Sequence, residues 1–262
     1  MKDMNVLDKI LENKRDEIKR RKSLVPSFLL QNSPNYSRKK YSLKDSLKVS
    51  SCGIIAEFKR KSPSRGFIQE KASADVVIPS YVRAGAAACS VLTDTSFFGG
   101  SCDDLMMARE CADIPLLRKD FIIDSYQVEE AAAWGADAIL LIAAALEYGC
   151  CRELVACAHE LGLEVLLEVH GSTELDYLFS GIDVVGVNNR DLGSFVTDVN
   201  ISFELAREIP EDFVKISESG ITSMQVVKEL RKVGYNGFLI GERFMKEADP
   251  AVALGEFLRD EN

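Results

Sequence analysis

The stretch Ile54-Ile55-Ala56-Glu57-Phe58-Lys59-Arg60-Lys61-Ser62-Pro63-Ser64-Arg65-Gly66 begins as an apolar run and ends in charges and a turn. A continuous apolar run of this length is typical of a strand buried in a parallel sheet. Glu57 and Lys59 are two residues apart, so a strand places both side chains on one face. A surface ion pair would stabilise little, whereas charges at the end of a buried strand are typical of a functional site. The same pattern recurs along the chain, which favours a site.

Eight short apolar segments predict strands at Gly53–Lys59, Ala88–Asp94, Pro115–Lys119, Ala138–Ala143, Glu164–Val169, Asp183–Asn188, Phe213–Glu218 and Gly237–Gly241. Apolar residues at i, i+3 and i+4 predict helices between them, at Asp75–Ala84, Asp103–Cys111, Ser125–Trp134, Glu147–Leu161 and Thr222–Val233. Gly85, Gly135, Gly162 and Gly234 follow four of these helices, where glycine provides a left-handed cap. Eight strand–helix units predict an α/β fold, a closed (β/α)8 TIM barrel. The alternative is a doubly wound open sheet, which the missing Gly-x-Gly-x-x-Gly after the first strand disfavours.

The 262 residues predict a single domain over 1–262, with an N-terminal helical extension at 1–50 and the barrel at 51–262. An apolar stripe predicts a helix across Asn5–Lys22, and Ser42–Lys48 suits a short helix before the first strand. Residues 1–50 carry a net charge of +7, which leaves −16 for the rest of the −9 total. The acidic total argues against a nucleic-acid binder. We expect the basic extension to lie over the acidic barrel or to attract an anionic substrate.

Cysteines and histidines restrict the chemistry further. The seven cysteines form no Cys-x-x-Cys, which is typical of reduced thiols in a cytoplasmic protein. With only His159 and His170, no His/Cys metal cluster is predicted. The most apolar region, Ala131–Leu146, is too short to span a bilayer, so we expect no membrane association.

Residues at the carboxyl ends of barrel strands line the active sites of such folds. In this chain the predicted strand ends include two lysines and two glutamates, Glu57, Lys59, Lys119 and Glu168. Carboxylates beside ammonium groups can be adjusted as general acids and bases. Ser219-Gly220 and Gly241 stand after strands seven and eight, where barrels commonly bind phosphate, although such residues also serve as plain helix caps. Phe98 and Phe121 could hold an aromatic group or belong to the core.

Seven segments in order carry a resemblance to a known family, namely Ile55–Ser64, Phe98–Ser101, Leu117–Ile122, Leu167–Val169, Val187–Leu192, Ser217–Ile221 and Phe238–Glu242. The chain resembles indole-3-glycerol phosphate synthase of tryptophan biosynthesis. The resemblance implies ring closure, decarboxylation and dehydration of 1-(2-carboxyphenylamino)-1-deoxyribulose 5-phosphate. It implies a small phosphorylated substrate, no cofactor and no metal. We expect a monomer or homodimer with no nucleic-acid or membrane partner, and, because the sequence ends soon after the last predicted strand and its helix, no fusion to a second enzyme.

The resemblance also implies roles for individual residues. Catalytic roles fall to Glu57, Lys59, Lys119, Glu168 and Asn188, substrate binding to Ser62, Phe98, Phe121 and Arg190, and phosphate binding to Ser219, Gly220, Gly241 and Glu242. Lys119 would be the general acid for the carbonyl oxygen, and Glu168 would stabilise the cationic intermediate or act as a base. Glu57 and Lys59 would serve the dehydration. We expect Glu242 to serve the phosphate through its backbone N–H, with its side chain turned away.

Three other functions fit parts of the pattern. The isomerase of the preceding tryptophan step needs a Cys and Asp pair, whereas the first strand carries Glu57 and Lys59. An inactive barrel used as a scaffold would be expected to lack some of the implied catalytic residues, and none is missing. An RNA-binding arm is suggested by Lys19-Arg20-Arg21-Lys22, and it would show salt-dependent RNA retention.

Overall fold

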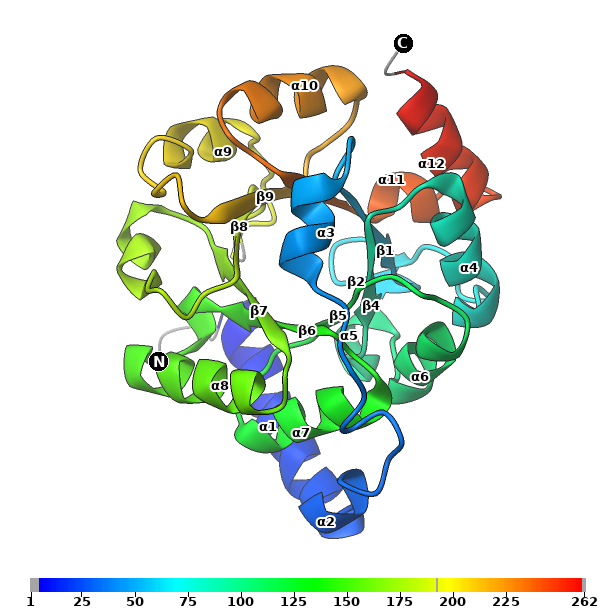
Figure 1. Cartoon of the computed structure of the whole chain (residues 1–262), viewed down its shortest axis with the longest axis vertical. Helices are drawn as coiled ribbons and strands as arrows, with labels where there is room; N and C mark the ends of the chain where they lie inside the picture. The colour runs from blue at the N-terminus through cyan, green and yellow to red at the C-terminus, as the bar shows by residue number, and fades with distance from the viewer. Residues whose placement is uncertain (1–4, 192, 261–262) are drawn as a thin grey trace.

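Eight parallel strands close into a barrel in the computed structural model, which describes residues 5–191 and 193–260 (Figure 1). The strands are β1 (Ile54–Phe58), β4 (Ala88–Leu92), β5 (Leu116–Lys119), β6 (Ala138–Ile142), β7 (Glu164–Val169), β8 (Val184–Asn188), β9 (Val214–Glu218) and β10 (Gly237–Ile240). All eight predicted strands are confirmed. Because β1 pairs with both β4 and β10, the ring is closed and the doubly wound alternative is wrong. Leu192, which ends one of the matching segments, lies outside the described residues.

Helices surround the barrel, and they are α4 (Ala74–Ala84), α6 (Cys102–Glu110), α7 (Ser125–Trp134), α8 (Tyr148–Glu160), α9 (Asn200–Leu205), α10 (Met224–Lys232) and α12 (Pro250–Arg259). The five predicted helices are confirmed, and the predicted cap glycines 85, 135, 162 and 234 all have positive φ. The ranges of the helices α9 and α12 were not predicted from the sequence. Other unpredicted elements are the short helices α2 (Ser27–Leu30), α5 (Thr95–Phe98) and α11 (Glu242–Met245), the antiparallel pair β2 (Lys61–Ser62) and β3 (Gly66–Phe67), and the 3-10 turns η1 (Ala143–Ala145) and η2 (Ser172–Tyr177). No described helix is long and apolar enough to cross a membrane.

The barrel interior is filled by apolar side chains. Ile55, Leu117, Leu166 and Ile216 belong to one buried cluster inside the ring, and they come from β1, β5, β7 and β9. These are alternate strands in the barrel order, which is how barrel interiors stack layers of four side chains. The next inward position on a strand is two residues further on. The register therefore fixes which residues form the layer above.

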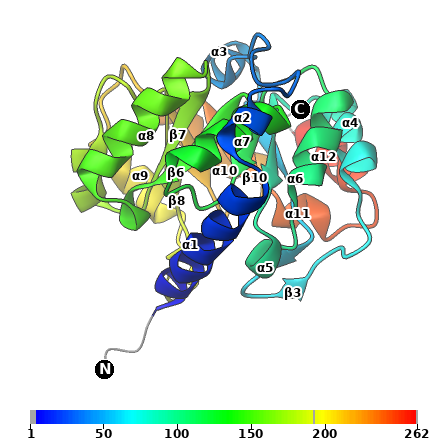
Figure 2. The same cartoon turned by 90° about the horizontal axis from the view of Figure 1, so that it is seen from below.

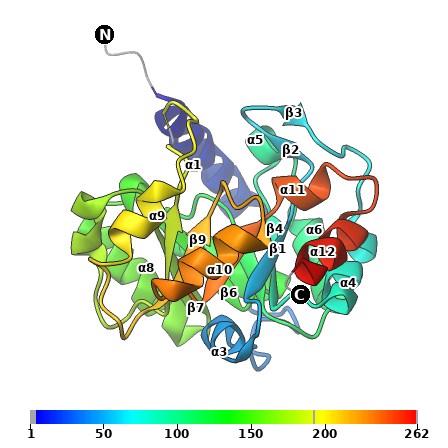
Figure 3. The ribbon, with the colours of Figure 1, turned by 90° about the horizontal axis from the view of Figure 1, so that it is seen from above.

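The N-terminal extension reaches both ends of the barrel. Helix α3 (Leu43–Val49) lies at the end where the strands begin, and α1 (Val6–Leu24) lies at the opposite end (Figures 2 and 3). Leu43 and Leu47 of α3 are buried in the inner cluster, and each such burial contributes about 2 kcal/mol. The start of α3 is fixed to β7 because the Ser42 hydroxyl donates to Glu164 Oε1 at 2.6 Å.

A buried charge cluster attaches α1 to the barrel. Lys14 is 1% exposed, and its Nζ lies 2.9 Å from both Asp94 Oδ2 and Asp120 Oδ1. Burial disfavours the ammonium, but Asp120 and Asp94 outweigh this and raise the pKa of Lys14 well above its ordinary value. Arg21 and Lys22 form further ion pairs with carboxylates near α7. The expectation that the basic extension lies over acidic parts of the barrel is confirmed.

Replacing Lys14 with Ala leaves Asp94 and Asp120 buried without this cation. We expect the free energy of unfolding to fall by about 3 kcal/mol, because breaking a buried ion pair uncovers a desolvated charge. Urea denaturation measures the change. Lys19→Ala, at an exposed position of the same helix, is the matched control and should cost less than about 0.5 kcal/mol. Equal losses in the two variants would contradict the structural role of Lys14.

Candidate active site

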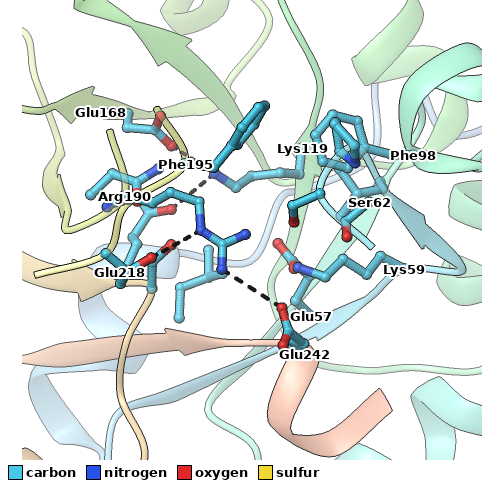
Figure 4. A pocket seen from close by; sticks show the side chains of 18 of the residues that line it. Glu57, Lys59, Ser62, Phe98, Lys119, Glu168, Arg190, Phe195, Glu218 and Glu242 are labelled. Carbon is cyan, nitrogen blue, oxygen red and sulfur yellow. Dashed lines mark hydrogen bonds and ion pairs between the residues drawn. The ribbon is translucent and has the colours of Figure 1, made fainter. Parts of the chain in front are cut away.

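One cavity of about 440 Å³ lies where the strands end (Figure 4). It is lined by every residue to which the sequence assigned a role, namely Glu57, Lys59, Ser62, Phe98, Lys119, Phe121, Glu168, Asn188, Arg190, Ser219, Gly220, Gly241 and Glu242. Val6, Leu7 and Ile10 of α1 also line it, so the extension contributes directly to the pocket. Among the described residues, no group of three or more His, Cys, Asp and Glu is arranged to hold a metal ion.

The floor of the cavity is a layer of four charged side chains. Glu57, Lys119, Glu168 and Glu218 each stand two residues after a member of the apolar layer, on β1, β5, β7 and β9. Lys119 Nζ lies 2.7 Å from Glu168 Oε2 and 2.9 Å from Glu218 Oε2. Burial disfavours the ammonium, yet Glu168 and Glu218 raise the pKa of Lys119 well above its ordinary value. Lys119 is therefore charged at neutral pH.

The two carboxylates that share Lys119 differ in their acidity. For Glu168, burial is outweighed by Lys119 and His170, which hold its pKa well below the ordinary range. For Glu218, burial raises the pKa to about 7, since Lys119 opposes the rise only in part and the Glu168 charge adds to it. Carboxyl groups whose pKa values are pushed apart are the usual sign of separate acid–base roles. At neutral pH Glu168 is ionised and Glu218 can either accept or donate a proton.

Glu218 is the main site residue to which the sequence gave no role. Its position at a strand end was visible, but nothing in the linear order showed that it touches Lys119. One feature of the sequence could have indicated this contact, namely the glycine at position 186 within β8. A Cβ atom at Gly186 would clash with the Glu218 carboxylate. Glycine inside a strand often marks such a close approach.

Glu57 and Lys59 face the same way, as the spacing predicted, and Lys59 Nζ lies 2.6 Å from Glu57 Oε1. Glu57 is 4% exposed and packs against the backbone at Gly241. A Cβ at position 241 would collide with the Glu57 side chain, so glycine is needed there for packing. The pair is thus fixed in place by β1 and by the loop after β10.

The loop after β9 has an uncommon backbone. Ser219 and Gly220 have φ of 66° and 74°, and Ser219 is one of two non-glycine residues with positive φ in the described chain. The buried Asn189 supports this turn, because its Nδ2 donates to the Ser219 carbonyl at 2.9 Å and to Ser217 Oγ at 3.0 Å. Backbone strain of this kind gathers at functional sites.

The expected orientation of Glu242 is wrong. Its carboxylate does not turn away, because Oε1 lies 2.9 Å from Arg65 Nε and Oε2 lies 3.7 Å from Arg190 Nη2. Figure 4 shows the side chain directed toward Arg190 across the pocket. The two guanidinium groups attract the carboxylate, and the sequence could not show that their side chains reach the start of α11.

Aromatic side chains enclose the other part of the pocket. The rings of Phe98 and Phe121 lie 6.1 Å apart at 38°. Phe195, which the sequence did not single out, also lines the cavity with a positive φ of 59°. It follows β8, which lies opposite β4 in the ring, whereas Phe98 follows β4. Arg190, which also lines the cavity, is held by its Nε donating to Thr197 Oγ1 at 3.1 Å.

A closed (β/α)8 barrel that gathers acid–base groups in a cavity at its strand ends has the architecture of a barrel enzyme. Its sequence matches the model of the family described as indole-3-glycerol phosphate synthase over residues 7–257. The chain belongs to the indole-3-glycerol phosphate synthase family, whose members are decarboxylating lyases of tryptophan biosynthesis.

Curated relatives carry the same name. The indole-3-glycerol phosphate synthase of Bacteroides thetaiotaomicron is 52% identical over 259 residues, which cover 99% of each chain. That of Salinibacter ruber is 41% identical and covers 96% of this chain and 94% of its own. Among solved structures, thiamine phosphate pyrophosphorylase from Pyrococcus furiosus is similar with a TM-score of 0.60 and 15% identity, covering 84% of this chain and 97% of that one. This last similarity concerns the fold alone.

Replacing Lys119 with Met removes the cation that lowers the pKa of Glu218. We expect that pKa to rise above its wild-type value of about 7, because burial then acts without the opposing ammonium. A pH titration of the infrared band of protonated carboxyl groups measures it, and Glu218→Gln identifies the band. A midpoint that stays unchanged in Lys119→Met would contradict the coupling.

Proposed function

We propose that the pocket converts 1-(2-carboxyphenylamino)-1-deoxyribulose 5-phosphate into indole-3-glycerol phosphate, CO2 and water, with the roles given below. The observation that carries the proposal is the Lys119 ammonium between Glu168 and Glu218 in a cavity with aromatic walls. This arrangement supplies a largely buried acid beside one ionised carboxylate and one carboxyl group whose pKa is about 7. Ring closure onto a carbonyl group requires such an acid near the oxygen.

The substrate has an aromatic end and a phosphate end, and the pocket has matching regions. Phe98 and Phe121 support an apolar site for the anthranilate ring. Ser219, Gly220, Gly241 and the backbone N–H of Glu242 form the proposed phosphate site, while Ser62 and Arg190 orient the carboxylate and hydroxyl groups. Asn188 fixes the Arg190 backbone, since its Oδ1 accepts from the Arg190 N–H at 3.0 Å.

Ring closure follows from the charges around Lys119. The ring carbon that bears the carboxylate bonds to the carbonyl carbon, and Lys119 gives a proton to the carbonyl oxygen. The ring becomes cationic at this point, and the ionised Glu168 stabilises that charge. CO2 then leaves, and the electron pair of the broken bond restores the aromatic ring. Glu218, 2.9 Å from Lys119, is the group that returns a proton to it.

Dehydration uses the second pair of charges. The nitrogen lone pair expels the new hydroxyl group, which takes a proton from Lys59 and leaves as water. Glu57, 2.6 Å from Lys59, accepts the proton lost from the neighbouring carbon. One acid and one base within contact of each other are what a dehydration needs.

Lys119→Ala tests the proposal most directly. We expect turnover to fall by about 1,000-fold, because general acid catalysis and the cation between the carboxylates are lost together. The increase in indole fluorescence on adding the substrate measures the rate. Lys71→Ala, at an exposed lysine outside the cavity, is the matched control with wild-type turnover. Wild-type turnover in Lys119→Ala would overturn the assignment of the acid.

Arg190→Ala tests the binding of the substrate anion. We expect KM to rise by about 10-fold with a smaller change in kcat, because a charge-assisted contact to the substrate is lost in both ground and transition states. Steady-state kinetics by the same fluorescence assay separates the two constants. Arg207→Ala removes an exposed arginine outside the pocket and serves as the control. An unchanged KM in Arg190→Ala would remove this residue from the substrate contacts.

The seven cysteines all have free thiols, which supports the proposed cytoplasmic location.

A further inference from the structure

His170 lies directly behind the reaction layer and has no part in the mechanism above. It directly follows the end of β7, two residues after Glu168. Its side chain is 13% exposed and does not line the cavity. A histidine in this place acts on substrate only through a neighbour, and that neighbour is Glu168.

Both nitrogens of the His170 ring face carboxylates. Nε2 lies 3.3 Å from Glu168 Oε1, and Nδ1 lies 3.3 Å from Glu174 Oε2. The backbone N–H of His170 donates to the same Glu174 oxygen at 2.7 Å, which fixes the carboxylate of η2 under the ring. A neutral imidazole carries one N–H, whereas the imidazolium carries two. Two carboxylates on opposite ring nitrogens are therefore matched to the charged form.

Glu168 has a cation at each of its two oxygens. Oε1 faces His170 and Oε2 faces Lys119 at 2.7 Å. A carboxylate held in this way has a fixed orientation, and its ionised form is favoured. The charges thus alternate along a chain that runs from Glu174 through His170, Glu168 and Lys119 to Glu218.

We propose that His170 is a positioning residue, an imidazolium held by Glu174 that keeps Glu168 ionised and aimed at Lys119. This inference rests on the proposed role of Glu168 in the reaction. The titratable groups that interact with His170 are Glu168 of β7, Glu174 of η2 and, through its charge, Asp191 after β8. Beyond Glu168 stand Lys119 and Glu218. Glu57 completes the floor layer.

The surrounding charges decide the state of His170. Burial disfavours the cation, but the carboxylates of Glu168 and Glu174 outweigh it and raise the pKa of His170 to about 10. The cation is then present throughout the neutral range and is lost only as the pH rises through that value. Removing the His170 cation takes away one of the two positive charges that lower the pKa of Glu168. The pKa of Glu168 is therefore expected to rise.

His170→Asn tests the consequence for the reaction. The amide replaces the ring with an uncharged group, and we expect kcat to fall by about tenfold with KM nearly unchanged. The acid limb of the pH profile of kcat should move to higher pH, because Glu168 is protonated more readily once one of the two cations that lower its pKa is gone. His159→Asn is the matched control, since that histidine is exposed and pairs with Asp183. A profile in His170→Asn that superimposes on wild type, with kcat within about twofold, would overturn the proposal.

Nuclear magnetic resonance gives a test that needs no turnover. The chain has only two histidines, so His159→Asn leaves the imidazole of His170 as the only histidine signal to titrate. We expect a midpoint near pH 10, and a lower one when Glu174→Gln is added. A midpoint near 6.5, the ordinary pKa of histidine, would overturn the proposal that His170 is an imidazolium held between two carboxylates. Such a result with an inactive Lys119→Ala enzyme would leave the proposed function intact, whereas full activity of Lys119→Ala would reject that function itself.

Discussion

The ammonium of Lys119, whose side chain is only 12% exposed, is the constraint on which the site depends. A charge this deep is stable only when carboxylates reach it, and Glu168 and Glu218 do so from the strands two places and four places away in the ring. The barrel makes this possible because alternate strands deliver side chains to the same layer. The layer below consists of apolar side chains, so it offers these charged groups no partner of opposite charge. The ammonium and the two carboxylates therefore pair with one another, and the pKa values of Glu168 and Glu218 move in opposite directions as a result.

The N-terminal extension supports this site by packing on both ends of the barrel. Helix α3 fills the end of the barrel where the strands begin, so the apolar layers are closed off from water there. Helix α1 lies at the opposite end, where its apolar residues form part of the cavity wall. Its Lys14 is held by Asp94 and Asp120, and Asp120 directly follows Lys119. The end of β5, which carries the proposed acid, is thereby held against a helix from the start of the chain.

Two glycines allow the charged side chains to pack closely against the neighbouring backbone. Gly186 leaves room for the Glu218 carboxylate, and Gly241 leaves room for Glu57. In both cases a side chain would displace a charged group of the floor layer. The functional consequence is that neither carboxylate can rotate away without losing its cation, since the position of each is set by backbone on one side and by a lysine on the other.

The sequence by itself determined the order of strands and helices, because periods of 2 and 3.6 and the glycine caps are local properties. It also placed Glu57, Lys59, Lys119 and Glu168 at strand ends, and the parallel order of a barrel then requires them to meet. Only the tertiary structure showed that Glu218 shares Lys119, that Glu242 reaches Arg65 and Arg190, and that Phe195 enters the pocket. Contacts of this kind depend on barrel register and on loop paths, which join residues far apart in the chain, whereas sequence patterns report only on neighbours.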